Sequence, residues 1–288
     1  MDSNAFFRRL DTIPDIPTLP EIALKVNKLL QDEDISIRKL SRIIEKDQAI
    51  VTKILRLVNS SFYQFKSRIE SIPRAMVVLG LNTIRNAVLS VSVIDIFPRE
   101  KSANGLDIRE FWKHSIAVAV VSKYLGSKTL LESPDECFIA GLLHDIGKVV
   151  LARYFVDVFD QVWTLVQAEG ITFFEAEKNV APVNHAQIGG YLAQRWQLPT
   201  GLTDAIKYHH GVSRFASNLN LSMIAHVANI VVNTCRPESD FKLTYSGMYP
   251  DAVDAMAPQL ETVSAWFPQL IPEIDSSYRF LVEDTGGT

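Results

Sequence analysis

The chain has 288 residues, 47% hydrophobic and 22% charged, enough for a globular protein to bury one large core or two closely packed ones. Its formal net charge of -4 leaves no positive surplus to neutralise a phosphate backbone, so we expect no direct DNA binding. Cys137 and Cys235 are far apart and form no C-x-x-C pair, which excludes a disulfide framework and a zinc ribbon. We expect both to be small buried hydrophobic residues.

No segment of the sequence has the character of an export signal or a membrane span. Residues 1–9 contain no long apolar run, and nowhere do about 18 uncharged apolar residues follow one another. We therefore expect a cytoplasmic protein that does not associate with membranes.

The first hundred residues have the apolar spacing of amphipathic helices, with hydrophobic residues at three- and four-residue steps. Helices are predicted at 19–30, 36–44 with Ser36 as N-cap, 47–58 before a break at 59–61, 72–80 and 82–97. The last includes the β-branched run 88–93, which we predict to be helical because no hairpin signals flank it. The charged stretch 98–105 then predicts a loop or an internal boundary.

Helical spacing continues through the rest of the chain, which is therefore predicted to be all-α. The further helices are expected at 107–125, 132–152, 157–168, 172–178, 184–196, 201–210 and 220–232. Prolines interrupt the pattern after Cys235, so short helices are expected at 249–260 and 261–266, before a frayed tail at 286–288.

Consecutive residues His144 and Asp145 are the first sign of a metal site. An imidazole nitrogen and a carboxylate oxygen can bind the same ion if the backbone there is helical and further ligands converge from elsewhere. Glu110 and His114 lie four residues apart on one predicted helix, so their side chains share a face.

Three more histidines, His185 and the consecutive His209 and His210, add to this set. Nitrogen and carboxylate ligands suit iron, manganese or zinc, and there are more of them than one tetrahedral ion needs. Each piece also has a simpler explanation: His185 as a hydrogen-bonded histidine, and the histidine pair as a polar helix end. We assign His226 to a structural role of this kind.

The order and spacing of these residues resemble the HD superfamily of metal-dependent phosphohydrolases. Leu143-His-Asp-Ile-Gly-Lys148 is similar to the HD-x-G-K signature of its HD-GYP branch. The resemblance implies that Lys148 contacts substrate phosphate, and it implies a set of metal ligands: Glu110, His114, His144, Asp145, His185, His209 and His210.

Several upstream segments look like the HDOD domain, the HD-related output domain of bacterial signalling proteins. They are Leu19-Pro20-Glu21, the segment ending Glu45-Lys-Asp47, the stretch from Ile54 to Ser60, Ala75 to Gly80, and Phe111-Trp-Lys-His-Ser115. The resemblance implies an HDOD module over 13–212, with an N-terminal helical part at about 13–97 and an HD-type helical bundle core from about 106. Residues 213–288 would be a C-terminal helical extension packed on that core.

Two departures from the HD-GYP pattern weaken the case for catalysis. Asn229 stands where that branch carries a further aspartate ligand, and a neutral amide is a poorer ligand for a hard cation. Gly211-Val-Ser-Arg-Phe-Ala-Ser-Asn218 stands where the Gly-Tyr-Pro loop would lie, so hydrolysis of cyclic di-GMP is not expected.

Two functions follow from this resemblance. One is a bacterial signalling module that holds two metal ions, iron foremost with manganese or zinc as alternatives, and acts on a signalling protein or a nucleotide ligand without turnover. The other is a metal-dependent phosphohydrolase acting on a nucleotide or cyclic dinucleotide, with Asp145 and Lys148 as catalytic residues and the metal activating water. A cluster that binds no metal is a third interpretation, but it leaves many buried polar groups to be satisfied by hydrogen bonds alone.

Overall fold

The computed structural model describes residues 2–30, 35–59, 68–97, 102–103 and 105–283. Residues 60–61 of the predicted break, most of the predicted loop at 98–105, and the predicted tail lie outside these ranges. The first helices are α1 (Ser3–Asp11), α2 (Glu21–Leu29), α3 (Ile37–Ile44), α4 (Gln48–Val58), α5 (Ile72–Leu79) and α6 (Leu81–Ile96). The central ones are α7 (Ile108–Thr129), α8 (Pro134–Leu143), α9 (Ile146–Tyr154), α10 (Val156–Glu169) and α11 (Phe173–Val180). The last are α12 (His185–Arg195), α13 (Thr200–Tyr208), α14 (Leu219–Thr234), α15 (Pro250–Glu261) and α16 (Val263–Tyr278).

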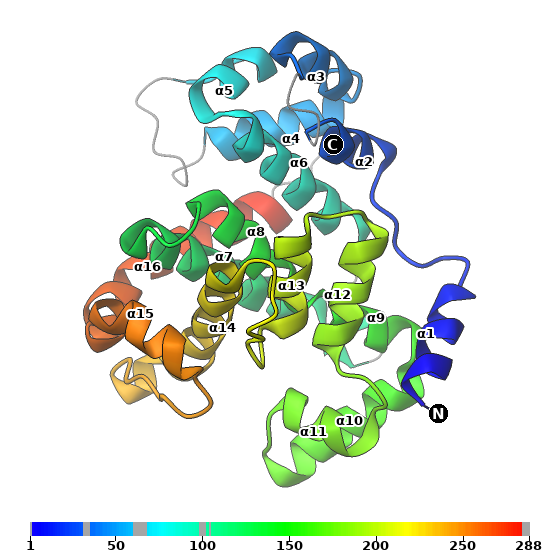
Figure 1. The fold of residues 1–288 in the computed structure, drawn as a ribbon, viewed down its shortest axis with the longest axis vertical. Coiled ribbons are helices and arrows are strands. Elements are labelled where there is room, and N and C mark those ends of the chain that lie inside the picture. Colours follow the sequence, from blue (N-terminus) through cyan, green and yellow to red (C-terminus); the bar gives the residue numbers. More distant parts are fainter. Residues whose placement is uncertain (1, 31–34, 60–67, 98–101, 104, 284–288) are drawn as a thin grey trace.

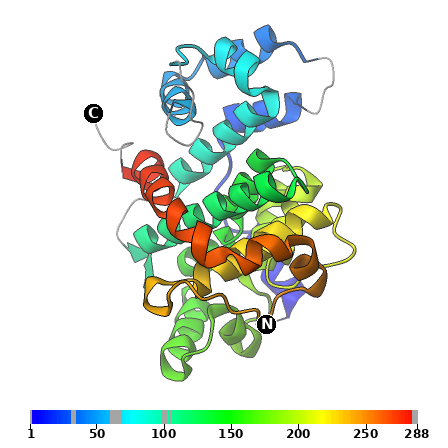
Figure 2. The same ribbon diagram turned by 90° about the vertical axis from the view of Figure 1, so that its left-hand side faces the viewer.

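The helices form a small upper group and a larger bundle, as Figure 1 shows. Helices α2 to α5 make up the upper group, and α6 runs from it down to the bundle, where it packs on α8. The bundle surrounds α7, a long buried helix that contacts α8, α14 and α16 (Figure 2). A five-residue π-helical turn, η2 (Arg279–Glu283), follows α16 and packs against α4 and α6.

The predicted helices of the upper group are confirmed, as is the predicted N-cap Ser36. The Ser36 hydroxyl accepts a hydrogen bond from the backbone N–H of Lys39, and the Asp47 carboxylate accepts one from Ile50. Gly80, with φ of +87°, separates α5 from α6 in a conformation that favours glycine. The β-branched run 88–93 is helical and almost wholly buried, because α6 packs against several other helices.

The sequence reasoning missed α1 and the way it is attached. Asp2 caps this helix, and Phe6 stacks on Phe155, the residue between α9 and α10, with ring centroids 4.0 Å apart. Further along, the indole N–H of Trp196 donates to the carbonyl of Pro17 at 2.9 Å. These contacts hold the N-terminal segment, up to the start of α2, against the surface of the bundle.

The helix predicted over 132–152 is wrong, because the chain breaks at His144 and Asp145. Helix α8 ends at Leu143, and α9 begins at Ile146. Asp145 has φ of -98° and ψ of 6°, in the sparsely populated bridge region where many active-site residues lie. The break turns both side chains inward, which one continuous helix would not do.

Smaller differences occur at two other places. A two-residue antiparallel pair, β1 (Ser102–Ala103) with β2 (Leu106–Asp107), precedes α7 in a chain predicted to be all-α. The expected short helix at 261–266 is instead the long α16, which runs through Pro268 and Pro272. A short 3-10 turn, η1 (Pro237–Ser239), lies between α14 and α15.

The prediction that the two cysteines are buried is confirmed, and both are free. Among the described residues, no helix combines the length and the apolar character needed to cross a membrane.

Two glycines let the helices that carry His144 and His185 approach their neighbours closely. A Cβ on Gly141 would lie 2.7 Å from the Cα of Ala119 on α7. A Cβ on Gly147 would lie 2.0 Å from the carbonyl oxygen of His185, at the crossing of α9 and α12. Backbone stands at both contacts, so no side-chain rotation could relieve a clash.

The substitution Gly147→Ala is expected to destabilise the protein by about 3 kcal/mol, because its methyl group would push α9 away from α12. Urea unfolding followed by circular dichroism measures this change. Gly211→Ala is the matched control, since nothing lies within 4 Å of a Cβ there. Equal stability of the two variants would contradict the close packing of α9 on α12.

Candidate metal centre

Six side chains from separate parts of the chain converge inside the bundle. Their ligand atoms form two groups, each within 4.8 Å, and Asp145 belongs to both: His114, His144 and Asp145, and Asp145, His185, His209 and His210. Helix α7 supplies His114, the break between α8 and α9 supplies His144 and Asp145, and α12 begins with His185. The paired histidines follow the end of α13.

The carboxylate of Asp145 lies between the two groups. Its Oδ2 is 3.3 Å from Nε2 of His144 and 3.5 Å from Nε2 of His114. Its Oδ1 is 3.0 Å from Nε2 of His185 and 3.5 Å from Nε2 of His209. His210 joins the second group through its Nε2, 3.0 Å from Nε2 of His185. Each carboxylate oxygen therefore faces one group of imidazoles.

Backbone carbonyls orient two of the imidazoles. Nδ1 of His144 lies 2.7 Å from the carbonyl oxygen of Gly141, and Nδ1 of His209 lies 2.7 Å from that of Ile206. A carbonyl can only accept, so Nδ1–H donates and the lone pair of Nε2 points into the cluster. These rings are held in the tautomer that a metal ligand needs.

Burial and neighbouring charges shift the pKa values of the cluster. Burial lowers the pKa of His114 and of His209 to about 3, and burial together with His209 and His185 lowers that of His210. Burial alone would raise the pKa of Asp145, but His144 and Lys148 hold it well below its usual range. At neutral pH His114, His209 and His210 are therefore neutral imidazoles beside an ionised carboxylate.

Two buried atoms of the cluster have no hydrogen-bond partner among the residues that the structure describes. They are Nε2 of His144 and Oδ1 of Asp145, both in residues no more than 1% exposed. Unsatisfied buried polar atoms are rare in native proteins and call for an explanation. A cation between the carboxylate and the imidazoles would satisfy both atoms, and the donor set suits iron, manganese or zinc. The residues present therefore fit a metal.

Of the two other predicted ligands, one lies away from the cluster and the other beside it. Glu110 is outside the cluster: its carboxylate points to solvent, 67% exposed, and binds the Lys113 ammonium at 2.7 Å. Asn229, on α14, lies beside His114, and its side-chain oxygen accepts a hydrogen bond from Asn233 at 2.8 Å. The ion pair with Lys113 neutralises the Glu110 carboxylate. His114, one turn later on α7, is the residue that enters the cluster.

Lys148 and His226 also have defined places. The ammonium of Lys148 donates to Oδ2 of Asp145 at 2.6 Å and lies 5.4 Å from the centre of the Phe173 ring. His226 has the expected structural role, with Nδ1 2.7 Å from the carbonyl of His209 and Nε2 accepting from the backbone N–H of Tyr249.

Sequence reasoning missed Glu177 on α11. Its carboxylate is fully buried, and Oε2 lies 2.6 Å from Nδ1 of His185. Burial alone would lower the pKa of His185, but Glu177 raises it above its usual value. No spacing rule points to a glutamate on another helix, so only the packing of α11 against α12 reveals this contact.

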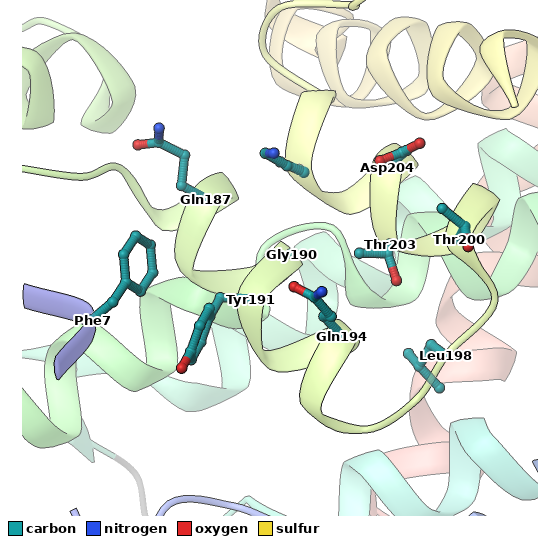
Figure 3. Close-up of a pocket in the computed structure, with 10 residues that line it drawn as sticks. Phe7, Gln187, Gly190, Tyr191, Gln194, Leu198, Thr200, Thr203 and Asp204 are labelled. Carbon is teal, nitrogen blue, oxygen red and sulfur yellow. The ribbon is translucent and has the colours of Figure 1, made fainter. Parts of the chain in front are cut away.

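A separate cavity of about 460 Å³ lies along α12 and α13 (Figure 3). Phe7 and Tyr191 stand side by side at one end, their ring centres 4.7 Å apart, and Thr200, Thr203 and Asp204 line the other. None of the six clustered side chains lines it. This cavity is therefore distinct from the candidate metal centre.

Comparison with known proteins identifies the family. The family model of the HDOD domain matches residues 16–212, about two thirds of the sequence, and the chain therefore belongs to the HDOD family. An uncharacterised protein of Treponema pallidum is 28% identical over 215 residues, which cover 70% of this chain and 39% of that protein. The chain thus spans well under half the length of this curated relative.

Solved structures show the same fold. An HDOD domain protein of unknown function from Geobacter sulfurreducens is 26% identical, with a TM-score of 0.73 over 96% of both chains. A candidate phosphohydrolase from Shewanella amazonensis is 22% identical, with a TM-score of 0.73 over 95% of this chain and 97% of its own. A candidate signal transduction protein from Marinobacter aquaeolei is 20% identical, with a TM-score of 0.70 over 94% of this chain and 59% of its own.

The placement of Glu110 and His114 on one helix gives a matched test of the cluster. We expect His114→Ala to weaken metal binding about tenfold or more, because an imidazole facing Asp145 is lost. Glu110→Ala should bind metal like the wild type, because its carboxylate faces solvent. Titration of chelator-treated protein with Zn²⁺ and Mn²⁺ measures both. A loss in Glu110→Ala as large as that in His114→Ala would place Glu110 among the ligands.

Proposed function

We propose that this chain is a bacterial signal-transduction module that holds two metal ions, iron foremost with manganese or zinc as alternatives. It acts by binding a signalling protein or a nucleotide ligand, without turnover. His114, His144 and Oδ2 of Asp145 would hold one ion, and Oδ1 of Asp145 with His185, His209 and His210 the other. Residues 13–212 would form the HDOD module, with an N-terminal part to 97 and a core from 106. Residues 213–288 would extend that core.

One observation carries the choice of binding over catalysis: Asp145 is the sole carboxylate among the six clustered side chains, and Lys148 already binds it at 2.6 Å. A two-metal phosphohydrolase needs carboxylates that hold its cations firmly and a free cation for the substrate phosphate. Here Asn229 supplies only an amide beside His114, and the ammonium of Lys148 neutralises the one carboxylate. This arrangement favours a retained metal centre over a reactive one.

The comparisons agree with a signalling role. The M. aquaeolei structure is named as a candidate signal transduction protein, and this chain covers 59% of it. The T. pallidum relative is also much longer than the matched region. An HDOD module that recurs within longer chains suits a domain that passes a signal to other parts of a protein.

The second candidate function is hydrolysis of a phosphoester. It is favoured by the presence of six converging ligands beside a lysine, and by the S. amazonensis structure named as a candidate phosphohydrolase. A bound metal would supply an activated water. Asp145 would orient the imidazoles, and Lys148 would have to leave Asp145 before it could hold a phosphate oxygen.

Kinetics with metal-loaded protein distinguishes the two functions. We expect wild type to hydrolyse bis(p-nitrophenyl) phosphate and cyclic dinucleotides no faster than His144→Ala, because Lys148 and Asp145 neutralise one another. Isothermal titration with the same cyclic dinucleotides tests binding without turnover. The proposal is overturned if turnover falls by about tenfold or more in both His144→Ala and Lys148→Met, since that dependence marks catalysis at the cluster.

A further inference from the structure

Glu177 is a buried carboxylate with no role in the sequence motif. Both of its oxygens bind one residue: Oε1 accepts the backbone N–H of His185 at 2.6 Å, and Oε2 lies 2.6 Å from Nδ1 of the same residue. The two side chains are fully buried. Burying a carboxylate costs free energy unless the carboxylate is well paired. The two contacts with His185 supply that pairing, so Glu177 and His185 act as one unit.

The double contact fixes both the position and the tautomer of His185. His185 is the first residue of α12, so its backbone N–H has no partner within the helix, and Glu177 supplies one. A carboxylate at Nδ1 requires that nitrogen to donate, which turns Nε2 toward Oδ1 of Asp145 at 3.0 Å. Metal-ligating histidines are oriented by carboxylates in this way.

The partner of His185 comes from a different helix, unlike those of the other oriented histidines. His144 and His209 bind carbonyls three residues earlier in their own segments. Glu177 instead belongs to α11, which forms a hairpin with α10 that projects from the bundle (Figure 1). The orientation of His185 thus depends on where this hairpin lies.

The ring contacts of α11 fall on the same cluster. Phe174 stacks on His210 with ring centres 4.2 Å apart and planes 10° apart. Phe173 meets His185 edge-on at 5.8 Å and receives the Lys148 ammonium over its face at 5.4 Å. Helix α11 is therefore attached to the bundle through residues of the metal centre.

We propose that Glu177 is a positioning residue for His185, and that through it the attachment of the hairpin α10–α11 is coupled to occupancy of the metal centre. The proposal rests on the metal centre of the proposed function. A bound metal ion would hold Nε2 of His185 in the cluster, and that ring contacts Glu177 and Phe173 of α11. Loss of the ion would then free the ring and loosen the hairpin.

The coupling is tested with Glu177→Gln and the matched control Glu175→Gln, two residues earlier on α11. Glu175 is exposed, and glutamine can still accept from the backbone N–H of Thr172 in its capping box. In Glu177→Gln the amide can donate to Nδ1, which favours the tautomer with its proton on Nε2. We expect zinc to bind about 10–100-fold more weakly to Glu177→Gln, as for other lost orienting partners, and normally to Glu175→Gln.

Hydrogen exchange gives the second readout. Zinc should slow amide exchange in residues 173–180 of wild type and of Glu175→Gln, and leave it unchanged in Glu177→Gln. His209→Ala removes a cluster imidazole outside the hairpin, and it should also abolish the zinc-dependent slowing of exchange. This variant tests the coupling even if Glu177→Gln does not fold. If zinc does not change amide exchange in residues 173–180 of the wild type, the coupling is refuted. If Glu177→Gln binds zinc as tightly as the wild type, the positioning role is refuted.

A metal-independent measurement separates this proposal from the proposed function. If wild type takes up no metal, the metal centre fails, yet ring ¹⁵N NMR of the metal-free protein still reports on His185. Wild type should carry the proton of Nδ1 toward Glu177, and Glu177→Gln should show a changed protonation pattern at that ring. Identical ring spectra in the two proteins would overturn the role of Glu177.

Discussion

The buried carboxylate of Asp145 holds together side chains that arrive from α7, α8, α9, α12 and α13. A lone ionised carboxylate in a protein interior is expensive, and it persists only where charges and polar groups compensate it. His144 and Lys148 lower its pKa, and imidazoles line both of its oxygens. The packing of the bundle around α7 places these side chains next to the Asp145 carboxylate.

Local geometry and long-range packing contribute in different ways. The break between α8 and α9 directs His144 and Asp145 inward, and Gly147 allows α12 to deliver His185 at its first residue. The cluster can form only where these helices cross closely. Helix α11 then covers the second group of ligands, where Glu177 binds His185 and Phe174 stacks on His210.

The sequence predicted most helices because helices depend on local pattern, and the resemblance to the HD-GYP motif pointed to the residues that the structure brings together in the cluster. Apolar spacing and the Ser36 cap act within a few residues, and the structure confirms them. The break at Asp145 was missed because apolar spacing runs through it, and only the requirements of the site oppose a continuous helix. Glu110 and Glu177 show the same limit: helical spacing cannot tell that one glutamate faces Lys113 and that another packs on His185.

Diffraction from crystals of protein purified without chelator, recorded across the iron, manganese and zinc absorption edges, tests the central claim most directly. We expect anomalous peaks beside Asp145, one facing His114 and His144 and the other facing His185, His209 and His210, with the iron edge giving the strongest signal. Ligand side chains in the same positions with no anomalous peak at any edge, and a water hydrogen-bonded to Nε2 of His144, would contradict that claim.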